Sequence, residues 1–150
     1  TGDIDALQRE VESAYSGVTF DSSKILTKPF ESISQVNTIL EDLWNGVVAL
    51  TFQDQTEDAQ LPQRVLKGYE QAATEAIANG FRHGGATAIQ IFTTADEHVL
   101  RVEIYDNGSG VKSSKFGLGA ELFDLITRKN WSLEELDQSS GLRLTLNIPI

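Results

Sequence analysis

Three short motifs in this 150-residue chain carry groups that could bind a metal ion and a phosphate. Glu75 and Asn79 stand four residues apart in the run EAIANGFRH, Asp106 begins the run DNGSG, and the third motif holds glycines at 117 and 119. Mg²⁺ prefers carboxylate and amide oxygens, and glycine-rich backbone before a helix presents free N–H groups to anions. Because a magnesium-nucleotide site needs both kinds of group, the motifs together predict a site for ATP.

The first motif falls on the strongest helical pattern of the sequence. Apolar residues recur at a spacing of about 3.6 residues between residues 61 and 77, and the glycines at 84 and 85 end the pattern. Residues four apart share one helix face, so Glu75, Asn79 and His83 lie together, opposite the apolar stripe. This face is either the solvated side of an amphipathic helix or a ligand face, and the glycines downstream favour the ligand face.

The second and third motifs supply a carboxylate and flexible backbone. Asp106 directly follows an apolar run, where Asp-Asn-Gly also forms ordinary turns. A carboxylate fixed at a strand end can accept a hydrogen bond from an exocyclic amine, and Gly108 and Gly110 let a flat ring approach the backbone. The Gly-Leu-Gly run at 117–119 is either a hinge or a helix start that attracts anions. Two lysines between the glycine clusters are candidate phosphate partners, Lys112 and Lys115.

The spacing of apolar residues also predicts the elements that position these motifs. Helices are expected over 3–15, over 30–43, from 61 to the glycines at 84 and 85, and after the Gly-Leu-Gly run. Strands are expected over 47–52, 88–94, 99–105 and 142–148, the middle two joined as a hairpin. Residues 53–60 form a polar linker, and Ser132 with Glu135 spells a capping box that predicts a helical turn. The predicted fold is α+β, a two-layer sandwich with helices over one face of a mixed, mostly antiparallel sheet.

Length and charge limit the domain organisation and the partners. The chain is long enough for one domain with an appended helical segment, and we assign residues 1–46 to an N-terminal helical segment or linker and 47–150 to the main domain. The N-terminal helices form either a hairpin packed on the domain or the end of a dimerising segment. A net charge of −10 argues against nucleic acid as a ligand, and the lack of Cys excludes disulfides and thiolate metal sites.

From about residue 61 to residue 150 the motifs resemble the ATP-binding domain shared by sensor histidine kinases, type II topoisomerases and mismatch-repair ATPases, the GHKL or Bergerat fold. The resemblance extends to the strand expected at 47–52. Within that family, the run EAIANGFRHGGAT resembles most the N box of the nitrate-sensor and thermosensor type of histidine kinase.

The resemblance implies a role for each candidate residue. It makes Glu75 the catalytic acid-base or water-orienting group and Asn79 the Mg²⁺ ligand, with Arg82 and His83 beside the phosphates. Asp106 would contact the adenine amine. The remaining cofactor-binding residues would line the base pocket or hold the phosphates: Gly108, Gly110, Lys115, Gly117, Leu118 and Gly119.

The resemblance further implies the catalytic domain of a two-component sensor histidine kinase, which binds Mg-ATP and transfers its γ-phosphoryl group to a histidine. The histidines of this chain are His83 and His98, outside the N-terminal helices, so we expect the acceptor on a helical domain absent from this chain. A response regulator would be the next partner, and the N-terminal helices could join two copies as a homodimer. The expected location is the cytoplasm, either free or as the cytoplasmic part of a membrane-anchored sensor.

Three departures from the family leave two other functions open. The segment between Gly110 and Gly117 has only six residues, Gly141-Leu142 stands where relatives carry Gly-Thr, and the capping box at 132–135 replaces a frequent strand. These departures lower the nucleotide affinity that we expect. The first alternative is therefore a degenerate ATP-fold scaffold that docks a protein partner. The second is a serine kinase of the anti-sigma-factor type with the same fold.

Overall fold

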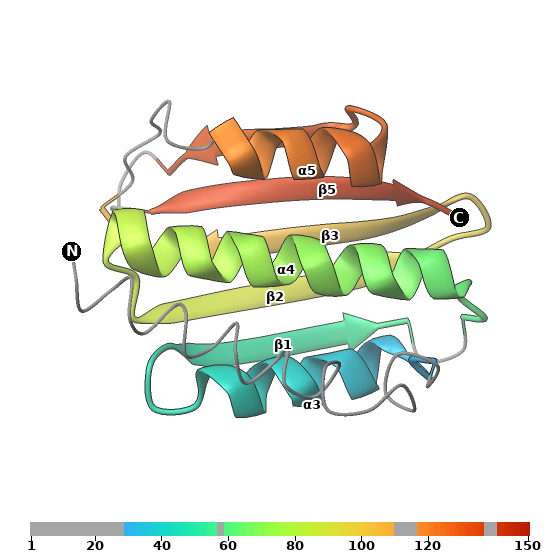
Figure 1. The fold of residues 1–150 in the computed structure, drawn as a ribbon, viewed down its shortest axis with the longest axis horizontal. Coiled ribbons are helices and arrows are strands. Elements are labelled where there is room, and N and C mark those ends of the chain that lie inside the picture. Colours follow the sequence, from blue (N-terminus) through green and yellow to red (C-terminus); the bar gives the residue numbers. More distant parts are fainter. Residues whose placement is uncertain (1–28, 57–58, 110–116, 137–140) are drawn as a thin grey trace.

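The computed structural model describes residues 29–56, 59–109, 117–136 and 141–150. They form a five-stranded sheet with strand order β1-β2-β3-β5-β4, and helices lie on one face of it (Figure 1). The strands are β1 (Ala49–Gln55), β2 (Ala88–Ala95), β3 (Val99–Asp106), β4 (Trp131–Glu135) and β5 (Leu142–Pro149). The helices are α3 (Ile33–Trp44), α4 (Gln63–Gly84) and α5 (Gly117–Thr127). The predicted α+β sandwich is confirmed.

The sheet is mixed and mostly antiparallel, as predicted. Strands β1 and β2 pair in parallel, and the pairs β2-β3, β3-β5 and β4-β5 are antiparallel. A parallel pair needs a crossover, which α4 provides between β1 and β2. The predicted hairpin joins β2 to β3, where Asp96 Oδ1 accepts hydrogen bonds from the backbone N–H groups of His98 and Val99. Within the described ranges, no helix has the length and apolarity needed to cross a membrane.

Helix α4 covers the centre of the sheet and carries the apolar stripe that the sequence predicts. Its buried apolar residues pack in one core with the inward rows of the strands. The helix ends at Gly84, and Gly85 forms the cap in the left-handed conformation, with φ 64°. The Tyr69 hydroxyl donates a hydrogen bond to Asn37 Oδ1 of α3, and burial raises the pKa of Tyr69 far above its ordinary value. Tyr69 is therefore a neutral donor inside the core.

Helix α3 lies within the predicted segment 1–46 but packs into the same core as the sheet. Ser32 caps it, since its Oγ accepts a hydrogen bond from the Gln35 N–H at 3.1 Å. Its fully buried apolar residues are Ile33, Val36, Leu40 and Trp44. The predicted boundary between residues 46 and 47 thus does not separate two hydrophobic cores. The assignment of the two parts to different functions stays a prediction. The helix predicted over 3–15 lies outside the described residues.

Two local predictions are wrong. Ser132 and Glu135 lie in strand β4, which pairs with β5, and not in a helical turn. The capping-box signal is local, whereas β4 gains a full ladder of backbone hydrogen bonds and the Trp131 ring packs on Phe123 with centroids 5.2 Å apart. Residues 53–55 belong to strand β1 rather than to a polar linker, because they pair with residues 92–94 of β2.

The end of α5 offers a test of backbone strain. Arg128 and Lys129 follow the helix with positive φ angles of 55° and 69°. The left-handed region costs a non-glycine residue about 1 kcal/mol, so Lys129→Gly should raise the free energy of unfolding by about that amount. Urea denaturation of both proteins measures the difference. In the control Glu121→Gly, at an exposed position inside α5, stability should fall by about 1 kcal/mol. A stability of Lys129→Gly at or below the wild-type value would contradict the expectation.

Candidate functional site

Glu75 and Asn79 lie where α4 meets the first turn of α5. Asn79 is only 3% exposed, and its Nδ2 donates a hydrogen bond to Glu75 Oε1 at 3.4 Å. Gly119 of α5 lies so close that a Cβ at this position would stand 2.9 Å from Asn79 Nδ2 and 3.5 Å from Glu75 Oε1. This face of α4 is therefore partly covered by α5, so the solvated-face alternative does not hold for Asn79.

Arg82 extends this polar group along α4. Its Nη2 donates a hydrogen bond to Asn79 Oδ1 at 3.3 Å, so the guanidinium, the amide and the carboxylate of Glu75 form a chain. Arg82 Nε is buried, and among the described residues no group accepts a hydrogen bond from it. This arrangement orients the Asn79 amide, with Oδ1 toward the Arg82 guanidinium and Nδ2 toward the Glu75 carboxylate. His83 follows on the exposed side of the helix.

Asp106 ends β3 beside the C-terminal half of α4. Its Oδ1 accepts a hydrogen bond from the Gly108 N–H at 2.9 Å, and its Oδ2 lies 3.4 Å from where a Cβ of Gly80 would stand. Burial raises the pKa of Asp106 above its ordinary value, and backbone N–H donors from Gly108 and Leu142 oppose that rise. The carboxylate is thus partly desolvated but held by two donors, which suits it to bind a polar group of a ligand.

The turn after Asp106 lies directly against the last turn of α4. A Cβ on Gly108 would stand 2.8 Å from the carbonyl oxygen of Gly84 and 3.0 Å from its Cα, so only glycine fits there. The Ser109 N–H donates a hydrogen bond to the same carbonyl oxygen at 2.8 Å. We call the described part of this turn, residues 106–109, the β3 turn. Its contact with Gly84 fixes the distance between Asp106 and α4.

The structure gathers most of the predicted residues at one end of the sheet, the left end in Figure 1. Helix α4 carries Asn79 toward α5, whereas its Gly80 and Gly84 face the β3 turn. Gly117 and Leu118 belong to the first turn of α5. Gly110 and Lys115 lie outside the described residues. The predicted roles of all these residues stay predictions, although the placement of the described ones is consistent with a single site.

Sequence reasoning missed two residues of this region. Gly80 of α4 faces the Asp106 carboxylate, and Asn107 joins the β3 turn to the start of β2. Glycine inside a helix costs about 1 kcal/mol relative to alanine, so Gly80, one turn before the end of α4, was a usable signal. Asn107 gave no such signal, because asparagine is common in turns for local reasons.

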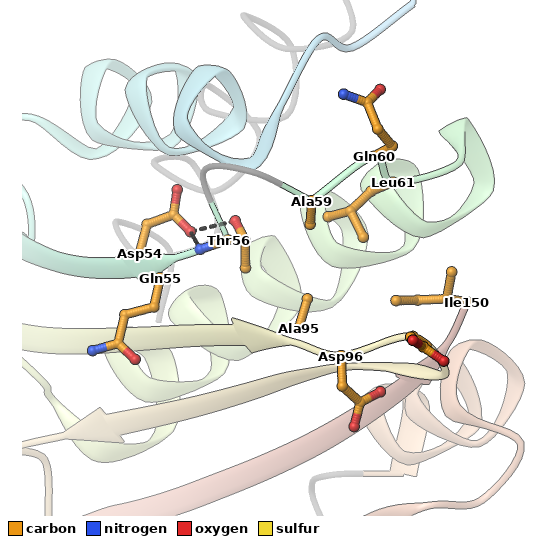
Figure 2. A pocket seen from close by; sticks show the side chains of 10 residues that line it. Asp54, Gln55, Thr56, Ala59, Gln60, Leu61, Ala95, Asp96 and Ile150 are labelled. Atoms are coloured by element: carbon orange, nitrogen blue, oxygen red, sulfur yellow. Dashed lines mark hydrogen bonds between the residues drawn. The ribbon is translucent and has the colours of Figure 1, made fainter.

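A cavity of about 570 Å³ lies at the opposite end of the sheet. Figure 2 shows its lining, which comes from the end of β1, the segment before α4 and the β2-β3 hairpin. Two of its acidic groups, Asp54 and Asp96, already have partners within the fold. Asp54 Oδ1 accepts hydrogen bonds from the Thr56 N–H at 2.9 Å and the Thr93 hydroxyl at 3.0 Å, and Asp96 caps the hairpin. None of the predicted site residues that the structure describes lines this cavity.

Comparison with known proteins places the sequence near sensor kinases. No protein-family model matches the chain. The sensor-type histidine kinase PrrB of Mycobacterium tuberculosis is 30% identical over 102 residues, which cover 55% of this chain and 23% of that protein. PrrB of Mycobacterium bovis matches to the same extent. The chain therefore spans less than a quarter of the length of the curated relatives that it matches.

Solved histidine kinase structures share the fold. The ATP-binding domain of PrrB from Mycobacterium tuberculosis aligns with a TM-score of 0.55 and 24% identity, over 78% of this chain and 90% of that one. The blue-light activated histidine kinase of Erythrobacter litoralis EL346 aligns with a TM-score of 0.61 and 16% identity, over 99% of this chain and 50% of that one. The fold is that of histidine kinase ATP-binding domains.

The raised pKa of Asp106 makes its contribution to stability depend on pH. Between the ordinary value of 3.8 and the raised value, the folded state keeps a proton that the unfolded state has released, so this contribution falls as pH rises. The unfolding free energy of the wild type minus that of Asp106→Asn should therefore decrease from acid to neutral pH. Urea denaturation across this range measures the difference.

Asp96→Asn is the matched control for this pH dependence. Backbone hydrogen bonds from His98 and Val99 lower the pKa of Asp96, so its stabilising contribution disappears as pH falls. The corresponding difference between wild type and Asp96→Asn should increase with pH. Equal slopes for the two substitutions would show that Asp106 is not desolvated.

The close approach of Gly108 to Gly84 gives a second test. A methyl group on residue 108 would collide with backbone atoms that cannot rotate away, so Gly108→Ala should destabilise the fold by about 1–3 kcal/mol. Thermal and urea unfolding measure this destabilisation. Ser109→Ala serves as the control, since residue 109 is exposed and its backbone N–H still reaches the Gly84 carbonyl. A Gly108→Ala protein as stable as this control would refute the close approach.

Proposed function

We propose that this chain is the ATP-binding catalytic domain of a sensor histidine kinase, which binds Mg-ATP and transfers the γ-phosphoryl group to a histidine on a separate helical domain. One observation carries the proposal. The amide-carboxylate pair of α4 and the partly buried Asp106 lie at the same end of a sheet that has the fold of histidine kinase ATP-binding domains. The similarity to PrrB, a sensor-type histidine kinase, supports the same assignment.

Asp106 is the proposed anchor for the base. An ionised carboxylate accepts hydrogen bonds and donates none, so it selects a ring that presents an amine, as adenine does. The close contact of Gly108 with the backbone of Gly84 holds this carboxylate beside α4. Leu142 stands where relatives carry threonine, so a side-chain hydroxyl is missing there. The backbone N–H of Leu142 nevertheless donates a hydrogen bond to the Asp106 carboxylate. This arrangement favours nucleotide binding over the scaffold alternative.

Asn79 and Glu75 are the proposed groups for Mg²⁺ and for the phosphoryl transfer. Their oxygens are hard donors, so the residues fit the ion that the function requires. When bound, Mg²⁺ would neutralise phosphate charge and position the transferred group. Asn79 Oδ1 would hold the metal, Glu75 would orient water or act as the base, and Arg82 would leave Asn79 Oδ1 to contact the phosphates. The first turn of α5, with Gly117, Leu118 and Gly119, would supply backbone N–H groups to the anion.

The finer predictions belong to the same proposal. The N-box sequence supports a kinase of the nitrate-sensor and thermosensor type. The whole protein would then pass its phosphoryl group to a response regulator, act in the cytoplasm or from a membrane anchor, and dimerise through the segment within residues 1–46. His83 and Lys115 would contribute to the phosphate side of the site, and Gly110 would line the base pocket.

Calorimetry with ATP and Mg²⁺ tests the proposal directly. The wild-type chain should bind ATP in a Mg²⁺-dependent manner. Asp106→Asn should weaken binding by at least about tenfold, because removing one partner of a buried hydrogen bond costs about 1–3 kcal/mol. Asp96→Asn, at the other end of the sheet, should bind like the wild type. A folded wild-type chain that binds no ATP would overturn the proposal and favour the scaffold alternative.

A phosphoryl-transfer assay separates the remaining alternative. Transfer of the γ-phosphoryl group to serine rather than histidine would favour the kinase of the anti-sigma-factor type.

A further inference from the structure

We propose that Asn107 is a positioning residue, whose carboxamide ties the β3 turn to the start of β2 and thereby holds the Asp106 carboxylate in place for base selection. The consequence for base selection rests on the proposed function. The positional effect on Asp106 does not, because it is a property of the ligand-free protein.

Asn107 makes a bridge with both ends of its side chain. Its Oδ1 accepts hydrogen bonds from the backbone N–H groups of Thr87 at 2.9 Å and Ala88 at 3.0 Å. Its Nδ2 donates to the Thr87 hydroxyl at 3.0 Å. The Asn107 backbone N–H also donates to the Ala88 carbonyl oxygen at 3.2 Å. We call these four hydrogen bonds the Asn107 bridge.

The partners of Asn107 distinguish this bridge from an ordinary turn. An asparagine in a turn usually bonds to its own backbone neighbours. The partners of Asn107 lie 19 and 20 residues away along the chain, at the end of the connection from α4 to β2. The side chain is exposed, so burial of apolar surface does not explain its position. Its hydrogen bonds instead join the DNGSG motif to Thr87, the last residue of the run EAIANGFRHGGAT.

The bridge acts on Asp106 through the geometry of the turn. The β3 turn is attached to α4 through Gly108 and Ser109, and to β5 through the Leu142 N–H. The sheet ladder to β2 ends at the pair of Ile89 with Asp106, and the Asn107 bridge continues this attachment to the residue that directly follows Asp106. Without the three side-chain bonds of the bridge, the turn beyond this last pair could rotate and shift the carboxylate. A group within a binding site must be held to a fraction of an ångström to discriminate between ligands.

We therefore expect loss of the Asn107 bridge to reduce the discrimination between adenine and guanine nucleotides. A fixed carboxylate rejects a base that presents a carbonyl oxygen at the position of the adenine amine, because two acceptors then face each other. A carboxylate that moves can avoid this repulsion and bind a water molecule instead. Asn107→Ala should weaken ATP binding by about tenfold, the effect of removing one polar interaction, while GTP binding changes less. The ratio of the two affinities should fall.

Amide hydrogen exchange tests the position of Asp106 without any nucleotide. The Gly108 N–H is bonded to Asp106 Oδ1, so its exchange reports whether the carboxylate stays in place. Exchange should accelerate by about tenfold in Asn107→Ala. Asn107→Asp keeps both accepted hydrogen bonds and should restore most of the protection, and with it the ATP-to-GTP ratio. Thr87→Val, which removes only the hydroxyl acceptor, should give an intermediate effect even if Asn107→Ala fails to fold.

Asn147→Ala is the matched control. Asn147 bridges two segments through Asn130 at 3.2 Å, away from Asp106, so its removal should leave the Gly108 exchange and the nucleotide ratio unchanged. Wild-type values of both readouts in Asn107→Ala would overturn the inference, as would effects equal to those of Asn147→Ala. A wild-type chain that binds no ATP would refute the proposed function, while the exchange of Gly108 would still decide the role of Asn107.

Discussion

The contact between Gly108 and the last turn of α4 is the constraint on which the rest of the site depends. Two backbone segments meet there without an intervening side chain, so the β3 turn cannot approach or retreat from the helix by small adjustments. Because α4 also carries Asn79 and Glu75, this one contact sets how far the carboxylate of Asp106 lies from the amide-carboxylate pair. Glycine at residue 108 is thus a geometric requirement of the site, whereas a Cβ at residue 84 would meet the β3 turn at ordinary contact distances of 3.4 Å and more.

The site places one cation, Arg82, among the carboxylates of an acidic chain. The protein carries a net charge of −10, yet Arg82 is positioned inside the polar cluster of α4 and donates to Asn79 Oδ1. In the ligand-free protein this cation occupies the oxygen that the proposed metal would need. Binding of Mg-ATP would then exchange one positive partner of Asn79 for another, which limits the desolvation that binding requires. The local arrangement of charges, and not the total, determines whether an anion can enter.

Sequence periodicity predicted the parts of the fold that burial dictates. Helix α4 with its glycine end, the β2-β3 hairpin and the alternating strand β5 all follow from apolar spacing that the core enforces. The failures come from interactions between distant residues. Strand β4 overrides the capping box of Ser132 and Glu135 because β5 offers it a partner. In the same way, α5 buries Asn79 and the connection before β2 receives Asn107, and no local pattern contains either interaction.

The register of the sheet has a consequence for the order in which the protein can fold during synthesis. Asp106 lies opposite Leu142, at the start of β5, and β4 pairs with the sheet through β5 alone. While a ribosome still holds residues 142–149, the nascent chain can form α4 and the β2-β3 hairpin, but the carboxylate lacks its second backbone donor and β4 has no neighbour. Such an intermediate exposes the edge of β3 to other strands. We therefore expect the proposed nucleotide site to mature only after β5 has left the ribosome, which makes chaperone protection most valuable in that interval.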